Sequence, residues 1–278
     1  MNERTSNPPQ DIHKQIADIQ SPTNSAHKHV SHTTIFHEIL ASKLPASEKS
    51  ATRLWQDGQV TVIAGTLTTA WALSVTTFHL LTLPDVLRTL KAELAAAMPD
   101  PAVAPPLATL EQLPYLTAVI QEGLRLSCGV SSRLSRIAPD EDLVFADAAA
   151  GAGRAWTIPR GTPVGMTSLL AHYDAACFPA PTEFRPQRFV AEPRLDRFLL
   201  AFSRGSRRCI GVNLAYAELY LAVARIFRRY GSVDVRGEDD VGALELYGTT
   251  ARDVEIVGDG ITPLVWKGSR GIRVRVVQ

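Results

Sequence analysis

FSRGSRRCIG, Phe202 to Gly211, is the stretch on which the interpretation of this chain depends. It holds Cys209, one of three cysteines in 278 residues, between Gly205 and Gly211. Glycine lets backbone lie against a flat ligand, because it has no Cβ. Cys209 also precedes a helix expected from Gly211, where unpaired amide hydrogens and the helix dipole favour an anionic sulfur. Cys209 is therefore either a metal ligand or the small buried hydrophobe that such a cysteine usually is.

Composition excludes several other classes of protein. The chain is 45% hydrophobic and 21% charged with a formal net charge of +1, which is typical of a soluble globular protein and gives no general field for nucleic acid. Three widely spaced cysteines without a C-x-x-C pair predict a reducing compartment, with no disulfide and no zinc site. The sequence has neither a signal-peptide core nor about 18 consecutive apolar residues, so we expect no membrane span.

The expected organisation is α+β and mainly helical. Residues 1–33 are polar and interrupted by prolines, so we expect them to be poorly ordered; their HKHVSH segment is either a solvated loop or a metal site built from His27, His29 and His32. Apolar periodicity predicts a short helix that begins at Thr34 and ends before Pro45. It also predicts four longer helices, over residues 50–81, 84–97, 114–126 and 211–230. The first of the long ones should be buried on more than one face, because apolar residues surround it. Short β-like runs follow Ser127, and the tail alternates like a small sheet.

Two further motifs carry candidate functional residues. In QEGLR, Glu122 and Arg125 are three apart and share a helix face, which alone predicts no more than a surface ion pair worth about 0–1 kcal/mol. In IAGTLTTA, the helical period places Ala64, Gly65 and Thr68 on a side that is nearly free of bulk. Such a side admits either a flat ligand or a closely packed helix.

Together these motifs resemble the cytochrome P450 family of haem-thiolate monooxygenases. The pattern F-x-x-G-x-R-x-C-x-G matches Phe202, Gly205, Arg207, Cys209 and Gly211. The E-x-x-R helix is followed by P-x-R-F in EFRPQRF, and the motifs stand in family order from about residue 31 to the end. The segments IPRGTPVGM and NLAYAEL look most like those of filamentous-fungal members of the trichodiene-oxygenase-like type.

The resemblance implies a role for each of these residues. Cys209 would be the axial ligand of haem iron, in a cofactor-binding loop with Phe202, Gly205 and Gly211. Arg207 and Arg136 would face the haem propionates, although Arg136 is equally an ordinary surface arginine. Glu122, Arg125 and Arg188 would form a structural triad.

The long helix departs from the family at one position. Ala64, Gly65 and Thr68 match the A-G-x-(D/E)-T-T segment over the distal haem face, and Thr68 would help to deliver protons. Leu67 stands where the family has an acid. Because leucine cannot relay a proton, the acid–alcohol part of the mechanism is open here.

For the whole chain, the resemblance implies the carboxy-terminal haem-binding portion of the cytochrome P450 fold over residues 34–278. Members are about twice this length, so we expect the amino-terminal half and its endoplasmic-reticulum anchor to be absent, which leaves a cytoplasmic or unknown location. The implied cofactor is haem b (iron-protoporphyrin IX), with electrons from NADPH through a cytochrome P450 reductase.

The implied activity is insertion of one oxygen atom of O2 into an apolar small molecule, a terpene or polyketide of fungal secondary metabolism. Two alternatives remain. The chain is an inactive remnant, whose uncovered apolar faces would meet water, or it is a haem-thiolate isomerase or dehydratase.

Overall fold

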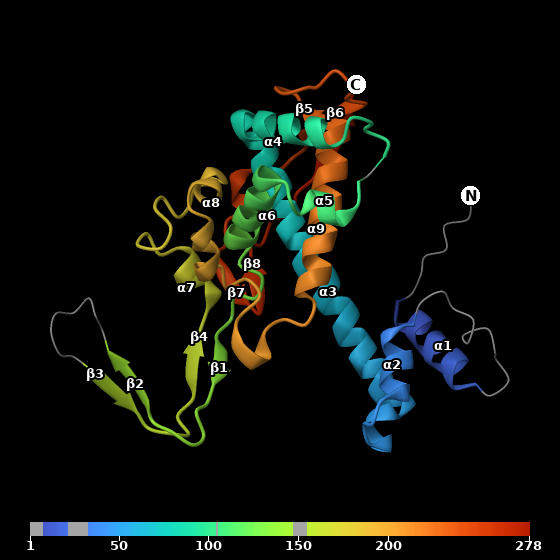
Figure 1. Ribbon diagram of the computed structural model, residues 1–278, viewed down its shortest axis with the longest axis vertical. Coiled ribbons are helices and arrows are strands. Elements are labelled where there is room, and N and C mark those ends of the chain that lie inside the picture. The colour runs from blue at the N-terminus through green and yellow to red at the C-terminus, as the bar shows by residue number, and fades with distance from the viewer. Residues whose placement is uncertain (1–7, 22–32, 104, 147–154) are drawn as a thin grey trace. The chain divides into compact units, whose positions relative to one another are not determined.

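The computed structural model describes residues 8–21, 33–103, 105–146 and 155–278, which fall into two units, Met1–Leu67 and Thr68–Gln278 (Figure 1). The 32-residue helix α3 (Ala51–Thr82) contributes to both units. Its length agrees with the prediction for residues 50–81, in which proline is absent.

The first unit packs α1 (Pro8–Gln20) and α2 (Ile35–Ala41) with the start of α3, and a 3-10 turn η2 (Ala46–Lys49) precedes α3. Ile12 and Ile16 of α1 are buried with Phe36 and Leu54. Gly58 of α3 permits the close approach of the Phe36 ring, because a Cβ at this position would lie 2.9 Å from that ring.

Helix α1 was not predicted, because the polar composition of residues 1–33 hid its apolar spacing. Ile12, Ile16 and Ile19 lie four and three residues apart, which is enough to form a narrow buried stripe. The expected boundary at residue 33 differs from the division after Leu67. His27, His29 and His32 lie outside the described residues.

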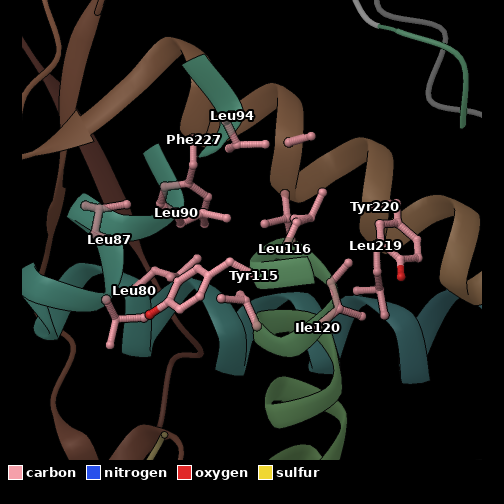
Figure 2. Packing of buried hydrophobic residues seen from close by; sticks show 14 of the residues in the cluster. Leu80, Leu87, Leu90, Leu94, Tyr115, Leu116, Ile120, Leu219, Tyr220 and Phe227 are labelled. Carbon is pink, nitrogen blue, oxygen red and sulfur yellow. The ribbon is translucent and has the colours of Figure 1, made fainter. Parts of the chain in front are cut away.

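The second unit is mainly helical. Its main core is formed by side chains of α3, α4 (Pro84–Ala97), α6 (Pro114–Ser127) and α9 (Val212–Arg229), and Figure 2 shows Leu90, Leu116 and Phe227 meeting there. Pro84 and Pro114 stand in the first turns of α4 and α6, where a missing N–H has no cost. The remaining short helices and turns are α5 (Leu107–Leu110), α7 (Ser168–His172), α8 (Gln187–Ala191), η3 (Pro193–Phe198), η4 (Gly205–Arg207) and η5 (Ala251–Asp253).

The strands form small, separate sheets. Antiparallel pairs join β1 (Leu134–Arg136) to β4 (Val164–Met166), β2 (Leu143–Ala146) to β3 (Ala155–Ile158), and β7 (Gly258–Gly260) to β8 (Thr262–Leu264). A three-stranded sheet pairs β6 (Gly242–Leu246) in parallel with β5 (Tyr230–Ser232) and antiparallel with β9 (Val274–Val277). The predicted α+β, mainly helical fold class is confirmed.

Burial along α3 corrects one prediction. Residues 60–67 are exposed, including Val60, Ile63 and Leu67, whereas Ala72 and Val75 are buried. The helix is therefore not buried on more than one face along its whole length. By length and composition alone, α3 is also long and apolar enough to cross a membrane. Its mean hydropathy is high even though polar residues interrupt its apolar runs, which is why the sequence pattern did not predict a span.

Candidate functional site

The segment that carries Cys209 folds as a closed loop before α9. The Cys209 amide donates to the carbonyl of Phe202 at 3.0 Å, which joins the two ends of the loop. Gly205 has a φ of +77°, a conformation that side chains disfavour, and it opens the turn η4. The Cys209 thiol is exposed, three residues before α9 begins at Val212, so Cys209 is not a buried hydrophobe.

The loop rests on α9 through aromatic contacts. The half-buried ring of Phe202 packs on Tyr216, with centroids 5.3 Å apart, and Tyr216 packs on Tyr220 at 6.2 Å. Burial raises the pKa of Tyr216 to about 12, so this phenol stays neutral. These contacts fix the base of the loop and leave its Cys209 end open.

The two motif glycines leave space on the Cys209 loop. A Cβ at Gly211 would lie 3.8 Å from Cys209 Sγ, in van der Waals contact with the sulfur. A Cβ at Gly205 would meet no described atom within 4 Å. Side chains at these positions would therefore cover surface that the glycines leave bare.

The other two cysteines have different surroundings. Cys128 is fully buried, its thiol donates to the Arg125 carbonyl at 3.3 Å, and burial raises its pKa to about 12. The pKa of Cys177 is also raised, by burial and by the charge of Asp174. These raised pKa values favour the thiol at Cys128 and Cys177 over the thiolate, which is the metal-binding form.

Glu122, Arg125 and Arg188 are in direct contact. The Arg125 Nε–H and Nη2–H donate to the two carboxylate oxygens of Glu122, both at 2.8 Å, and the Arg188 Nε–H donates to Glu122 Oε1 at 3.1 Å. Glu122 and Arg125 are fully buried and the Arg188 side chain is 8% exposed. The pair is thus not a surface ion pair, and both charges are compensated within the protein.

Arg125 also donates to three backbone carbonyls. These belong to His172 at 2.8 Å, Pro181 at 2.6 Å and Glu183 at 3.0 Å, so all five guanidinium N–H groups are used. The acceptors come from the last residue of α7 and from the segment between α7 and α8. Arg125 therefore fixes the path of the chain that leads toward the Cys209 loop.

His172 was missed by the sequence analysis, although HYDAACF places it beside the P-x-R-F segment. It is fully buried at the end of α7, where its Nδ1 lies 2.9 Å from the Arg125 carbonyl oxygen and its Nε2 accepts the Leu200 amide at 2.8 Å. Burial, with the nearby Arg125 charge, lowers its pKa to about 4. Histidine is common on protein surfaces, so the sequence alone does not indicate that a single histidine in a short helix is buried and hydrogen-bonded on both ring nitrogens.

The predicted cationic residues are both exposed. Arg207 lies in η4 of the Cys209 loop. Arg136 ends β1 and its guanidinium donates to the adjacent Ser135 carbonyl at 2.9 Å. Contact of these side chains with haem propionates stays a prediction.

The small residues of α3 have open surroundings. Ala64 and Gly65 are exposed, and a Cβ at Gly65 would meet no described atom within 4 Å. Thr68 is half-buried, and Leu67 is 58% exposed. Ala64 and Gly65 belong to the first unit, whereas Thr68 and Cys209 belong to the second, so the approach of this face to the cofactor stays a prediction.

Comparison with known proteins identifies the family. The family model for Cytochrome P450 matches residues 9–245. The chain belongs to the cytochrome P450 family. The match begins within α1 and ends within β6, so it includes the E-x-x-R helix, the P-x-R-F segment and the Cys209 loop.

Fungal cytochrome P450 proteins are the relatives of this chain. It is 51% identical over 271 residues to cytochrome P450 monooxygenase tpcC of Cochliobolus heterostrophus, which covers 95% of this chain and 50% of that protein. It is 48% identical over 275 residues to cytochrome P450 monooxygenase astB of Talaromyces wortmannii, with 97% and 55% covered. N-acetyltryptophan 6-hydroxylase ivoC of Emericella nidulans is 42% identical over 250 residues, with 87% and 45% covered. The chain therefore spans about half the length of these relatives.

The family implies a haem cofactor, and the Cys209 loop fits that group. Its thiol is exposed, the adjacent Gly211 has no Cβ to cover the sulfur, and Gly205 leaves open space on the same loop. Cys128, by contrast, is fully buried, and the Cys177 thiol lies 3.8 Å from the Asp174 carboxylate. The chemistry of the donor therefore agrees with thiolate ligation at Cys209.

Proposed function

We propose that this cytochrome P450 chain is the haem-thiolate part of a fungal monooxygenase that inserts one oxygen atom of O2 into an apolar small molecule. In this proposal Cys209 is the axial ligand. The observation that carries the proposal is its exposed thiol in a glycine-flanked loop, on a chain 51% and 48% identical to two named monooxygenases. Haem bound there would activate oxygen, and electron donation from the thiolate would favour O–O cleavage.

The protein supplies ligation, positioning and exclusion of water. Phe202, Gly205 and Gly211 shape the loop around the ligand. Arg207 and Arg136 are the proposed cations for the propionates, and both residues are exposed. Thr68, with Ala64 and Gly65 beside it, is the proposed oxygen-side element.

The substrate class is proposed from family likeness. The sequence predicts a terpene or polyketide of secondary metabolism, oxidised with electrons from NADPH through a reductase. One relative is named an N-acetyltryptophan 6-hydroxylase and another, 40% identical, a tryptophan 6-hydroxylase. Aromatic amino-acid derivatives therefore join the substrates to be screened. Membrane association at the endoplasmic reticulum is the proposed location of the complete enzyme.

Leu67 favours a second candidate function. A leucine stands where the family has an acid, and a leucine side chain cannot relay a proton. A haem-thiolate isomerase or dehydratase needs no such proton delivery, and an inactive remnant needs none either. Product analysis with O2 and reductase, and then with organic peroxide alone, separates the monooxygenase from these alternatives.

A ligand assay tests the proposal directly. The chain is expressed with haem available, reduced under carbon monoxide, and examined for the red-shifted Soret band typical of a thiolate ligand. We expect the band in the native chain and in Cys128→Ala, and its loss in Cys209→Ala. Absence of the band from the native chain, or its survival in Cys209→Ala, contradicts the proposal.

A further inference from the structure

His172 joins two parts of the fold that are far apart in sequence. It ends α7, which Thr167 caps by accepting the Leu169 amide, and its fully buried ring meets Phe178 edge-on at 6.4 Å. One side of the imidazole faces the end of α6, and the other faces the segment after η3. Its position is therefore determined by contacts from several elements.

The two hydrogen bonds of the ring determine its protonation state. The Arg125 carbonyl oxygen can only accept, so the proton must be on Nδ1, 2.9 Å away. The Leu200 amide can only donate, so Nε2, 2.8 Å away, must carry no proton. A neutral imidazole with its proton on Nδ1 satisfies both groups, and a lowered pKa of about 4 agrees with this form.

His172 is also bonded through its own backbone. The Arg125 Nη1–H donates to the His172 carbonyl at 2.8 Å, while the His172 ring donates to the Arg125 carbonyl. The Cys128 thiol donates to that same carbonyl, at 3.3 Å. Arg125 is the charged residue that acts on the ring, and two hydrogen bonds attach His172 to it.

On its other side His172 holds the chain that leads into the Cys209 loop. The Leu200 carbonyl accepts the Ser203 amide at 2.9 Å, and the Phe202 carbonyl accepts the Cys209 amide at 3.0 Å. Ser203 has a φ of +58°, which a side chain disfavours, so neighbouring contacts must hold this turn. Gly129 provides one such contact. Its backbone lies so close to the Ala201 carbonyl oxygen that a Cβ at this position would be 2.8 Å from that oxygen.

We propose that His172 is a positioning residue for the Cys209 loop, a hydrogen-bonded bridge from the buried Arg125 backbone to the Leu200 amide. The bridge transmits the rigidity of the Glu122–Arg125–Arg188 cluster to the turn from which the cysteine extends. Its consequence for ligation rests on the proposed function. The bridge itself does not, because it is made by residues of this chain alone.

Three variants of the full 278-residue chain test the proposal. His172→Phe keeps an aromatic ring and removes both polar atoms. His172→Gln keeps one donor and one acceptor on a side chain of similar reach. His79→Phe is the matched control, because His79 is a half-buried histidine whose pKa is also lowered to about 4 and whose ring stacks on Phe184 at 4.7 Å.

The first readout is amide hydrogen exchange, which needs no haem. We expect the Leu200 amide and the segment up to Cys209 to exchange at least about tenfold faster in His172→Phe. His172→Gln should restore part of the protection, and His79→Phe should leave this segment unchanged. Equal exchange in the wild type and His172→Phe, or equal acceleration by His79→Phe, overturns the proposal.

The second readout is the carbon monoxide spectrum of the reduced, haem-loaded chain. The share of the thiolate-type Soret band should fall in His172→Phe, recover in His172→Gln and stay unchanged in His79→Phe. An unchanged band in His172→Phe overturns the link to ligation. If the wild type shows no such band, the proposed function fails while the exchange experiment still decides whether His172 holds the loop.

Discussion

Replacing Arg125 by lysine tests the buried guanidinium while keeping its charge. Arg125 directs five N–H groups to five acceptors, the two oxygens of Glu122 and the carbonyls of His172, Pro181 and Glu183. A lysine ammonium has three N–H groups on one nitrogen. At least two of the five acceptors would therefore lose their donor; three are buried, and the Pro181 and Glu183 carbonyls are partly buried.

The size of the effect follows from that count. A buried polar group left unsatisfied costs about 1 to 3 kcal/mol, so two such groups cost about 2 to 6 kcal/mol in free energy of unfolding. For a chain of this size the urea dependence is about 3 kcal/mol per molar, which predicts a midpoint lower by about 0.7 to 2 M. Because lysine keeps the positive charge, this loss of stability measures the contribution of the planar, five-donor guanidinium group and not that of its charge.

The assay is urea unfolding followed by circular dichroism, with Arg88→Lys as the matched control. Arg88 pairs with Asp85 at the same three-residue spacing on α4, but its side chain is 62% exposed. Exchanging the cation in such a surface pair should cost less than about 0.5 kcal/mol. If Arg125→Lys shifts the midpoint no more than Arg88→Lys does, the buried guanidinium does not stabilise the fold as argued here.

Three further outcomes are expected. Gly123→Ala should cost about 1 to 3 kcal/mol in urea unfolding, because its Cβ would lie 1.9 Å from Thr76 Oγ1; an equal cost in a Thr76→Ala background would show that this contact is not the cause. Stability should fall as pH falls from about 6.5 to about 4, because the unfolded chain binds protons that His172 and His79, with pKa values lowered to about 4, do not bind in the fold. Each histidine contributes about 3 kcal/mol over that window. Unfolding of His172→Phe should be less dependent on pH, so an unchanged slope would exclude His172 as a source. In an active preparation Leu67→Asp should raise the ratio of product to NADPH consumed, and no gain would mean that the missing acid is harmless.

Most long helices were predictable from the sequence because their signals are local. Proline at Pro84 and Pro114 marks the starts of α4 and α6, and apolar periodicity covers the intervening turns. Helix α1 was missed because three isoleucines in a polar segment make only a narrow stripe. The parallel pairing of β5 with β6 was not predictable either, since it depends on where the chain returns.

The sequence by itself determined which residue types stand at each motif position, including Cys209 between two glycines and Glu122 three residues before Arg125. Such features depend on spacings of a few residues. Local backbone geometry alone places residues with these spacings on the same face of a helix or in the same turn. The family resemblance implied that Arg188 joins Glu122, and the tertiary structure gives the contact itself, across 66 residues. Only the tertiary structure decided that His172 receives the Leu200 amide. These contacts depend on the path of the whole chain, because burial and hydrogen bonding bring together groups that no local pattern relates.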